Sequence, residues 1–263
     1  METDRTAIDS LTASRLLAVL AWAAPHAFAR TGNDFDEDAG HDQMVVGVHN
    51  FVYIRDLLDR ATSNGRYELA TDTVGAGLDT IARGITPDAL SSMPIIESGA
   101  IARSDYKGSP GWAADGYRIL LQSVKFGDID HVKWGQRSSA KEEVAAQLFV
   151  GAATLFDDED FGLESVAGIP DDEAFAGITL VAAHSHDPFT GRFELHVGQS
   201  KNPEYRGDSC WHWRDLILSG GGLGEGINAS SSVNLTGAPA SADAEEISVP
   251  VRKPFAVPDV ENG

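Results

Sequence analysis

The chain is short of cysteine, of basic residues and of long apolar runs, and each shortage excludes a class of protein. Cys210 is the only cysteine among 263 residues, so an internal disulfide and a metal site with several thiolate ligands are excluded. No apolar run approaches the length of about 20 residues that a membrane-spanning helix needs. These features predict a protein of the cytoplasm, or of a particle inside the cell, without membrane association.

The charge balance is strongly acidic. Asp and Glu total 40 against 20 Lys and Arg, which gives a formal net charge of -20. The basic residues are scattered along the chain, often beside acids, so no basic patch is expected and nucleic-acid binding is unlikely on electrostatic grounds. An excess of carboxylates is typical of halophilic adaptation, because it keeps a protein soluble in salt. Mimicry of DNA by carboxylates on one face is the alternative interpretation.

The first thirty residues imitate a secretory signal peptide. Residues 16–22 are apolar, and residues 27–29 read Ala-Phe-Ala, which resembles a cleavage site. The preceding segment is acidic rather than basic, and Pro25 interrupts the apolar run. We therefore expect this segment to form a helix of the protein core.

Helical patterns dominate the N-terminal part of the chain. An apolar stripe after Ser10 predicts a helix that Pro25 bends or stops. Residues 43–63 predict a second helix. The Asn64-Gly65 pair ends it, since glycine adopts a left-handed conformation at little cost.

Two shorter helices begin at sequences typical of helix caps. Thr86 followed by Pro87 predicts a helix that ends near Met93. The sequence Ser-Ala-Lys-Glu from Ser139 is a capping box, and it predicts a helix that extends to about Phe156.

Strand patterns occupy the middle and the second half of the chain. Residues 117–126 are apolar and β-prone, and they predict a central strand. Residues 178–186 and 192–197 predict a hairpin joined by the turn at 187–191. Residues 209–219 then predict a helix that ends at a run of glycines.

These elements predict an α+β fold in which a helical N-terminal layer packs on a mostly antiparallel sheet. Residues 1–227 form a single domain in this prediction. From residue 228 onward the chain is rich in Ser, Ala, Pro and acids, so residues 228–263 predict an extended arm with little core of its own.

The predicted hairpin carries a candidate metal site. With five unpaired turn residues, His184 lies opposite Glu194 and His186 lies opposite Arg192, and His196 falls on the same face. Three histidines and a glutamate are ligands that Zn, Fe or Mn accepts, which indicates a metal-dependent hydrolase or oxygenase. The alternative is a polar face without a metal. A shift of one residue in the register would destroy the site.

A restriction-type nuclease is a second enzymatic alternative. Asp187 and the Gln-Ser-Lys run that ends at Lys201 resemble parts of such sites, but they lie at opposite ends of a predicted strand. Asp171 with Glu194 fits the strand order better, although His196 then stands where a lysine is expected.

No catalytic residue is identified from the sequence, which favours a protein that acts by interaction. We expect a subunit of a larger complex or particle, such as a virion component. The arm of residues 228–263 would then bind protein partners or mediate self-assembly, because its proline-spaced apolar part suits docking along a neighbouring surface.

Overall fold

The computed structural model describes residues 2–67, 80–147, 175–201, 207, 209–221, 228–229 and 233. The helices in this part are α1 (Glu2–Ala13), α2 (Leu16–Asp34), α3 (Gln43–Ala61), α5 (Pro87–Ser91) and α6 (Ser139–Ala145), with two 3-10 turns, η1 (Gly65–Tyr67) and η2 (Trp134–Gln136). The strands are β1 (Ala102–Arg103), β2 (Gly111–Ala114), β3 (Tyr117–Ser123), β4 (Ile178–His186), β5 (Phe193–Ser200), β6 (Trp211–Gly220) and β7 (Asn228–Ala229).

The described strands form one sheet in the order in which they occur in the chain, from β1 to β7. Neighbouring strands are antiparallel except β3 and β4, which run parallel. A parallel pair needs a crossover rather than a hairpin, and η2 and α6 lie in this crossover. The predicted α+β fold with a helical N-terminal layer on a mostly antiparallel sheet is confirmed.

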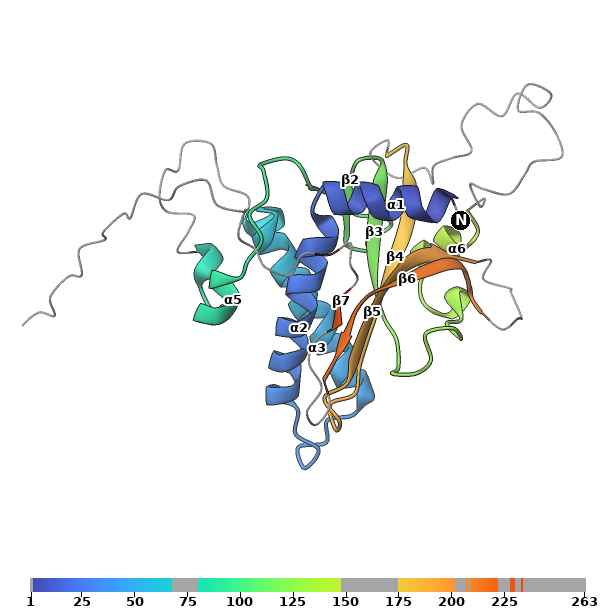
Figure 1. The fold of residues 1–263 in the computed structure, drawn as a ribbon. Helices are drawn as coiled ribbons and strands as arrows, with labels where there is room; N and C mark the ends of the chain where they lie inside the picture. The colour runs from blue at the N-terminus through green and yellow to red at the C-terminus, as the bar shows by residue number, and fades with distance from the viewer. Residues whose placement is uncertain are drawn as a thin grey trace, which may run out of the picture.

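The N-terminal helices cover one face of the sheet (Figure 1). α2 and α3 lie side by side along the strands, while α1 crosses the strands near one end of the sheet. α1 and α2 are bent by 80° relative to each other, and the chain turns at Arg15, which has a left-handed φ of 63°. This layer forms the main core with alternate strand residues, among them Leu17, Leu20, Phe28, Ile54, Leu58, Ile119, Leu121, Leu180, Leu195 and Val197.

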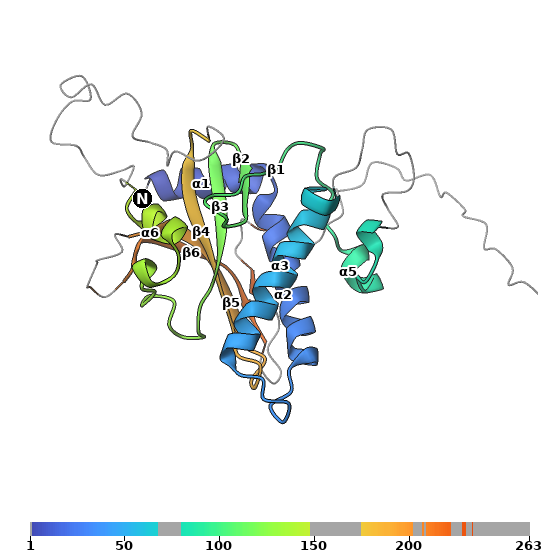
Figure 2. The same cartoon turned by 180° about the vertical axis from the view of Figure 1, so that it is seen from behind.

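A second, smaller core lies on the opposite face of the sheet. Figure 2 shows α6 on the other side of the strands from α2 and α3. Because side chains alternate along a strand, the residues between those of the main core point to this side. The cluster includes Tyr106, Leu120, Val124, Trp134, Val144, Val181, Ala183 and Trp211. The sheet is therefore covered on both faces over its central strands.

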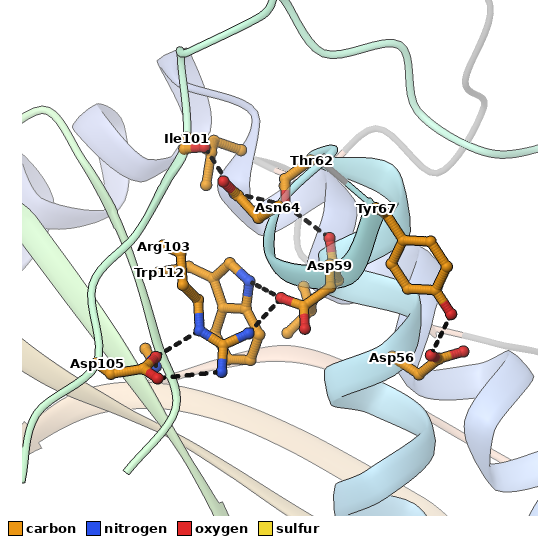
Figure 3. A network of polar contacts seen from close by, with 11 residues as sticks. Asp56, Asp59, Thr62, Asn64, Tyr67, Ile101, Arg103, Asp105 and Trp112 are labelled. Atoms are coloured by element: carbon orange, nitrogen blue, oxygen red, sulfur yellow. Dashed lines mark hydrogen bonds and ion pairs between the residues drawn. The ribbon is translucent and has the colours of Figure 1, made fainter. Parts of the chain in front are cut away.

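The C-terminal end of α3 is fixed to the sheet by the buried carboxylate of Asp59 (Figure 3). This carboxylate accepts a hydrogen bond from the indole nitrogen of Trp112 at 3.1 Å and another from the Arg103 guanidinium. Burial raises the pKa of Asp59 in spite of the opposing effect of Arg103. The Asn64 side chain donates to the Ile101 carbonyl at 2.9 Å. These contacts fix the position of α3 beside β1 and β2.

Several predicted elements are confirmed, and their caps explain where they begin. The Asp42 side chain accepts from the first backbone N–H groups of α3, and Thr86 caps α5, which has Pro87 at its first position. α6 begins as predicted, but its cap is Ser138 rather than Ser139. α6 ends at Ala145 with Ala146 as its C-cap, earlier than the predicted end near Phe156, and residues 148–156 lie outside the described residues.

A further predicted helix is wrong, and at Pro25 one of the two predicted alternatives is excluded. Residues 211–220 form the strand β6 instead of a helix, because pairing with β5 along its length and its aromatic and β-branched side chains favour extended backbone. Pro25 does not stop α2, which continues to Asp34 with buried side chains on both sides of the proline. Packing against the sheet and α3 outweighs the local effect of the proline here, and the chain breaks at Arg15 instead.

The start of the predicted arm belongs to the sheet. Asn228 and Ala229 form β7 and pair with β6, and Val233 is buried against the main core. Residues 230–232 and 234–263 lie outside the described residues.

None of the described helices is by itself both long and apolar enough to cross a membrane. α1 and α2 reach that length and composition only as a pair, across the 80° bend between them.

Candidate functional site

The β4–β5 hairpin has a different register from the predicted one. Leu195, and not Glu194, lies opposite His184. A shift of one residue sends the polar side chains of the two strands to opposite faces, so His184 and His186 face the helices while Glu194 and His196 face away. The predicted ligand set is therefore not assembled. Within the described residues there is no group of three or more His, Cys, Asp or Glu side chains that could hold a metal ion.

The turn of the hairpin explains this register. Asp187 and Arg192 are hydrogen-bonded through the Asp187 N–H and the Arg192 carbonyl at 2.8 Å, so four residues rather than five form the loop. The Asp187 carboxylate accepts from the Phe189 N–H at 3.1 Å and from the Thr190 hydroxyl at 2.6 Å. Gly191 supplies the positive φ of 72° that closes the turn. The four-residue loop thus shifts the pairing by one position from the predicted alignment.

His184 and His186 are core residues beneath α2. The ring of Phe28 stacks on His186 with centroids 5.3 Å apart and lies 6.1 Å from His184. Burial lowers the pKa of His184 to about 3 and that of His186 to about 4, so both rings are neutral at pH 7. Neither nitrogen of His184 has a hydrogen-bond partner among the described residues. The pair is enclosed and uncharged, which makes it unsuited to acid–base chemistry on a substrate.

His196 is held in a polar chain on the other face. Arg214 donates from Nη1 to His196 Nδ1 at 3.0 Å, because a guanidinium has no acceptor. The hydrogen of His196 therefore sits on Nε2, which donates to Glu194 Oε2 at 2.9 Å. Arg214 also binds the Asp130 carboxylate at 2.8 Å, and these hydrogen bonds lower the pKa of Asp130. Both ring nitrogens of His196 are engaged, so this histidine serves structure rather than proton transfer.

The remaining sequence candidates are separated or unreactive. Asp187 lies in the β4–β5 turn and Lys201 follows the far end of β5, so the structure keeps these two nuclease candidates apart. Asp171 lies outside the described residues. Burial raises the pKa of the Cys210 thiol to about 11, which leaves little thiolate at neutral pH.

An open groove of about 750 Å³ lies beside α3. We call it the α3 groove. One wall is the N-terminal half of α3, and the other is the chain that leads into α6; the end of β3 lies between them. The groove is lined by Gln43, Met44, Gly47, Val48, Phe51, Arg55, Gly108, Ser109, Pro110, Leu121, Gln122, Ser123, Val124, Lys125, Gln136, Arg137, Ser138 and Lys141.

The lining of the α3 groove contains four cations and no carboxylate. Arg55, Lys125, Arg137 and Lys141 come from three separate parts of the chain. Within the described residues none of the four forms an ion pair, whereas Arg60, Arg103, Lys107 and Arg214 elsewhere all do. The scattered basic residues predict no basic patch, but the fold brings four of them together in a chain of net charge -20. This local excess of positive charge suits an anion.

Lys141 is the most unusual of these cations because it is almost fully buried. Its exposed fraction is 4%, and burial lowers the pKa of its ammonium to about 8. No carboxylate or other acceptor binds this ammonium in the described part of the chain. A buried ammonium without a partner is strongly unfavourable, since desolvation is not offset by an attractive charge. The side chain lines the groove, so an anion bound there would supply the missing partner.

The α3 wall of the groove is apolar from Met44 to Phe51, and Arg55 follows one turn further along the helix. Met44 is 72% exposed and Val48 is 54% exposed, and Phe51 adds a half-buried ring. Gly47 lies between them and allows α3 to approach β3, because a Cβ at this position would lie 3.0 Å from the Ser123 hydroxyl. The groove therefore combines an apolar helix face with a basic floor and far wall.

One local feature of the sequence could have indicated the α3 groove. Lys141 shares the buried face of α6 with Val144 and Ala145, at the i+3 and i+4 spacing of one helical face. A lysine on such a face is seldom buried unless it is paired. The other cations carry no such sign, because only the tertiary fold brings Arg55 near Arg137.

Comparison with models of known protein families, with curated proteins and with solved structures gives no match. A role for the α3 groove therefore rests on its own geometry and charge.

Proposed function

We propose that this is an interaction protein that binds an acidic segment of a partner protein in the α3 groove. One observation supports this above all: four cations that form no ion pair within the described residues surround an open groove, and the described lining contains no carboxylate. In a chain with twice as many acids as bases, cations are normally neutralised by nearby carboxylates. Leaving four of them unpaired around one cavity favours an anion supplied from outside.

A short acidic polypeptide fits this surface better than a long nucleic acid. The electrostatic screening length is about 10 Å at 0.1 M salt, so a short ligand interacts mainly with the groove cations. A duplex would extend beyond the groove, where the excess of carboxylates repels its phosphates. The apolar wall formed by Met44 and Val48 also offers little to a phosphate backbone.

The proposal is tested with a fluorescein-labelled peptide of ten glutamates, whose binding is followed by fluorescence anisotropy at low salt. We expect binding that weakens as salt is raised. The triple variant Arg55→Gln, Lys125→Gln, Arg137→Gln should lower the affinity by about tenfold or more, because it removes three of the attracting charges.

A matched control removes three exposed cations outside the groove, in the variant Arg83→Gln, Lys133→Gln, Arg192→Gln. Its affinity should stay within about twofold of the parent, because the net charge changes equally but the groove does not. Equal losses in both variants would mean that only net charge matters, and the proposal would be wrong. Binding of a DNA duplex in the groove without binding of the peptide would also overturn it.

Assembly through the arm stays a separate prediction. Deletion of residues 234–263 preserves β7 and Val233, which belong to the sheet and the core. If the arm mediates assembly, light scattering should show a smaller particle with unchanged circular dichroism. An unchanged mass would contradict this prediction and leave the proposal for the groove untouched.

A further inference from the structure

We infer that the partner segment is an amphipathic acidic helix, which packs its apolar face on Met44 and Val48 and places a carboxylate on the buried ammonium of Lys141. This inference rests on the proposed function and specifies the ligand of the same groove.

α3 exposes a stripe of apolar side chains. Met44, Val48 and Val52 are 72%, 54% and 36% exposed, and they are three of the seven large apolar side chains that are exposed in the described residues. They recur every four residues, opposite the buried stripe that contains Val46 and Ile54. Eight residues of helix span about 12 Å, so the stripe is about two turns long, and its first two members, Met44 and Val48, line the groove. A stripe of this form suits a second helix with apolar residues at similar spacing.

Cationic side chains line the groove beside this apolar stripe. Met44 and Val48 line the groove on the α3 side, while Arg137 and Lys141 line it on the side of α6. A ligand that lies in the groove thus meets apolar atoms at the start of α3, and cations on the opposite side and at Arg55 further along the helix. An amphipathic acidic helix carries both surfaces at once. A purely acidic chain leaves the apolar wall exposed, and a purely apolar one leaves the cations unpaired.

Lys141 lies deep in the groove. The residue is only 4% exposed and lines the groove, so its ammonium is reached only by a group that projects into the groove. A glutamate side chain on the ligand helix has this reach and supplies the opposite charge. The hydroxyl of Ser138, which already accepts from the backbone N–H of Lys141, still has a hydrogen to donate to the same carboxylate. Lys141 therefore favours a ligand helix that carries an acidic residue beside its apolar face.

The test compares two labelled peptides of identical composition. One consists of Glu and Leu with leucines at the i, i+3, i+4 and i+7 positions of a helix, and the other has the same residues in scrambled order. We expect the amphipathic peptide to bind about tenfold more tightly, because only it presents a continuous apolar face. Equal affinities would overturn the inference. If the decaglutamate peptide still bound the groove, the proposed function would hold without the inference of an amphipathic helix. If no acidic peptide bound, the proposed function and the inference would both be wrong.

Two sets of variants locate the contacts. Met44→Gln with Val48→Gln should weaken the amphipathic peptide by about tenfold and leave decaglutamate nearly unchanged. The matched control, Ile95→Gln with Phe189→Gln, removes apolar side chains that are 67% and 69% exposed outside the groove, and it should change neither affinity. An equal effect of both double variants would show that the groove is not the binding site.

Lys141→Met separates a binding role from a structural one. Removal of a buried, unpaired charge should raise the melting temperature of the protein while it weakens the amphipathic peptide by about tenfold or more. A lower melting temperature with unchanged affinity would mean that Lys141 has only a structural role, which would overturn its assignment. Lys141→Gln, which keeps a polar side chain, checks the result if the methionine variant folds poorly.

Discussion

Two parts of the molecule bury titratable side chains without partners, and they differ in what burial does to the charge. Beneath α2, burial lowers the pKa of His184 to about 3 and of His186 to about 4, and both rings become neutral members of the core. In the α3 groove, burial lowers the pKa of Lys141 only to about 8, so most of the ammonium keeps its proton at pH 7.

The difference in charge follows from the ordinary pKa values, 10.5 for lysine and 6.5 for histidine, because burial lowers the pKa of Lys141 and that of His186 by similar amounts. The surroundings of the two sites differ as well. The histidines are enclosed by the ring of Phe28 and by the apolar side chains of β5. Lys141 lines an open groove, where a ligand can reach it. Two histidines on one strand face look like a metal site in the sequence, and one lysine in a helix looks ordinary. The fold reverses the interpretation: the histidines complete the core, and the lysine belongs to the candidate binding site.

The largest effect should follow from a permanent charge at the histidine site. His184→Lys should lower the free energy of unfolding by about 3–5 kcal/mol, because the fully buried position has no opposite charge. His212→Lys is the matched control on the exposed side of β6, and its cost should be below about 0.5 kcal/mol. Urea unfolding at pH 7 measures both values. A cost below about 1 kcal/mol at His184 would show that water reaches the site, and the contrast with the groove would disappear.

The histidine pair should also make stability depend on pH in acid. Both pKa values lie below the value near 6.5 of an unfolded histidine, so the unfolded chain binds protons first and stability falls as pH drops below about 6.5. Each histidine contributes at most about 1.4 kcal/mol per pH unit, and the pair should cost roughly 2 kcal/mol between pH 7 and pH 5.5.

The control for this prediction is His184→Leu with His186→Leu, which should reduce the loss of stability between pH 7 and pH 5.5 by about this amount. The rest of the slope should remain, because His26, His196 and His212, whose pKa values are also lowered, are present in both proteins. Urea unfolding at several pH values provides the data. An unchanged slope in the double variant would show that the histidines are already protonated or exposed in the folded protein.

Lys141 should produce a smaller effect in the alkaline range. Its folded pKa of about 8 lies below the value of 10.5 for a free lysine, so the unfolded chain holds its proton longer. Stability should therefore rise with pH from about 8, by about 1 kcal/mol between pH 7 and pH 9 relative to Lys141→Met. A bound acidic peptide should suppress this rise, because the carboxylate returns the ammonium to a higher pKa. The absence of any difference from Lys141→Met would show that Lys141 is hydrated.

Local sequence patterns predicted most of the individual elements. The boundaries of α3 and α5 follow from cap residues such as Asp42 and Thr86, which act within one helical turn. The strand β6 was missed because its alternation of apolar and polar residues breaks between Asp215 and Leu218, where the pairing with β5 shifts register. Pairing with β5 decides its conformation. The order of strands and the parallel pair of β3 and β4 depend on contacts that no local pattern encodes.

The candidate site depends on exact pairing and on tertiary proximity, and these are poorly specified by sequence. A difference of one residue in the length of the hairpin turn separates His184 from Glu194. The groove cations, by contrast, lie up to 86 positions apart between Arg55 and Lys141, and no spacing rule connects them. Only the burial of Lys141 on an apolar helix face could have drawn attention to the groove in advance.

The smallest predicted effect concerns His196, on the far face of the hairpin, and it asks whether this histidine is neutral like His184. Because Arg214 donates to Nδ1, the hydrogen on Nε2 needs only an acceptor. Glu194→Gln keeps a carbonyl oxygen there and should cost less than about 1 kcal/mol in urea unfolding at pH 7, whereas Glu194→Ala leaves the N–H unpaired and should cost about 1–2 kcal/mol. If His196 were charged, the glutamine variant would lose a charge-assisted hydrogen bond and cost as much as the alanine variant. A small cost of the glutamine variant would therefore indicate that His196 is neutral like His184 and His186, in contrast to the ammonium of Lys141.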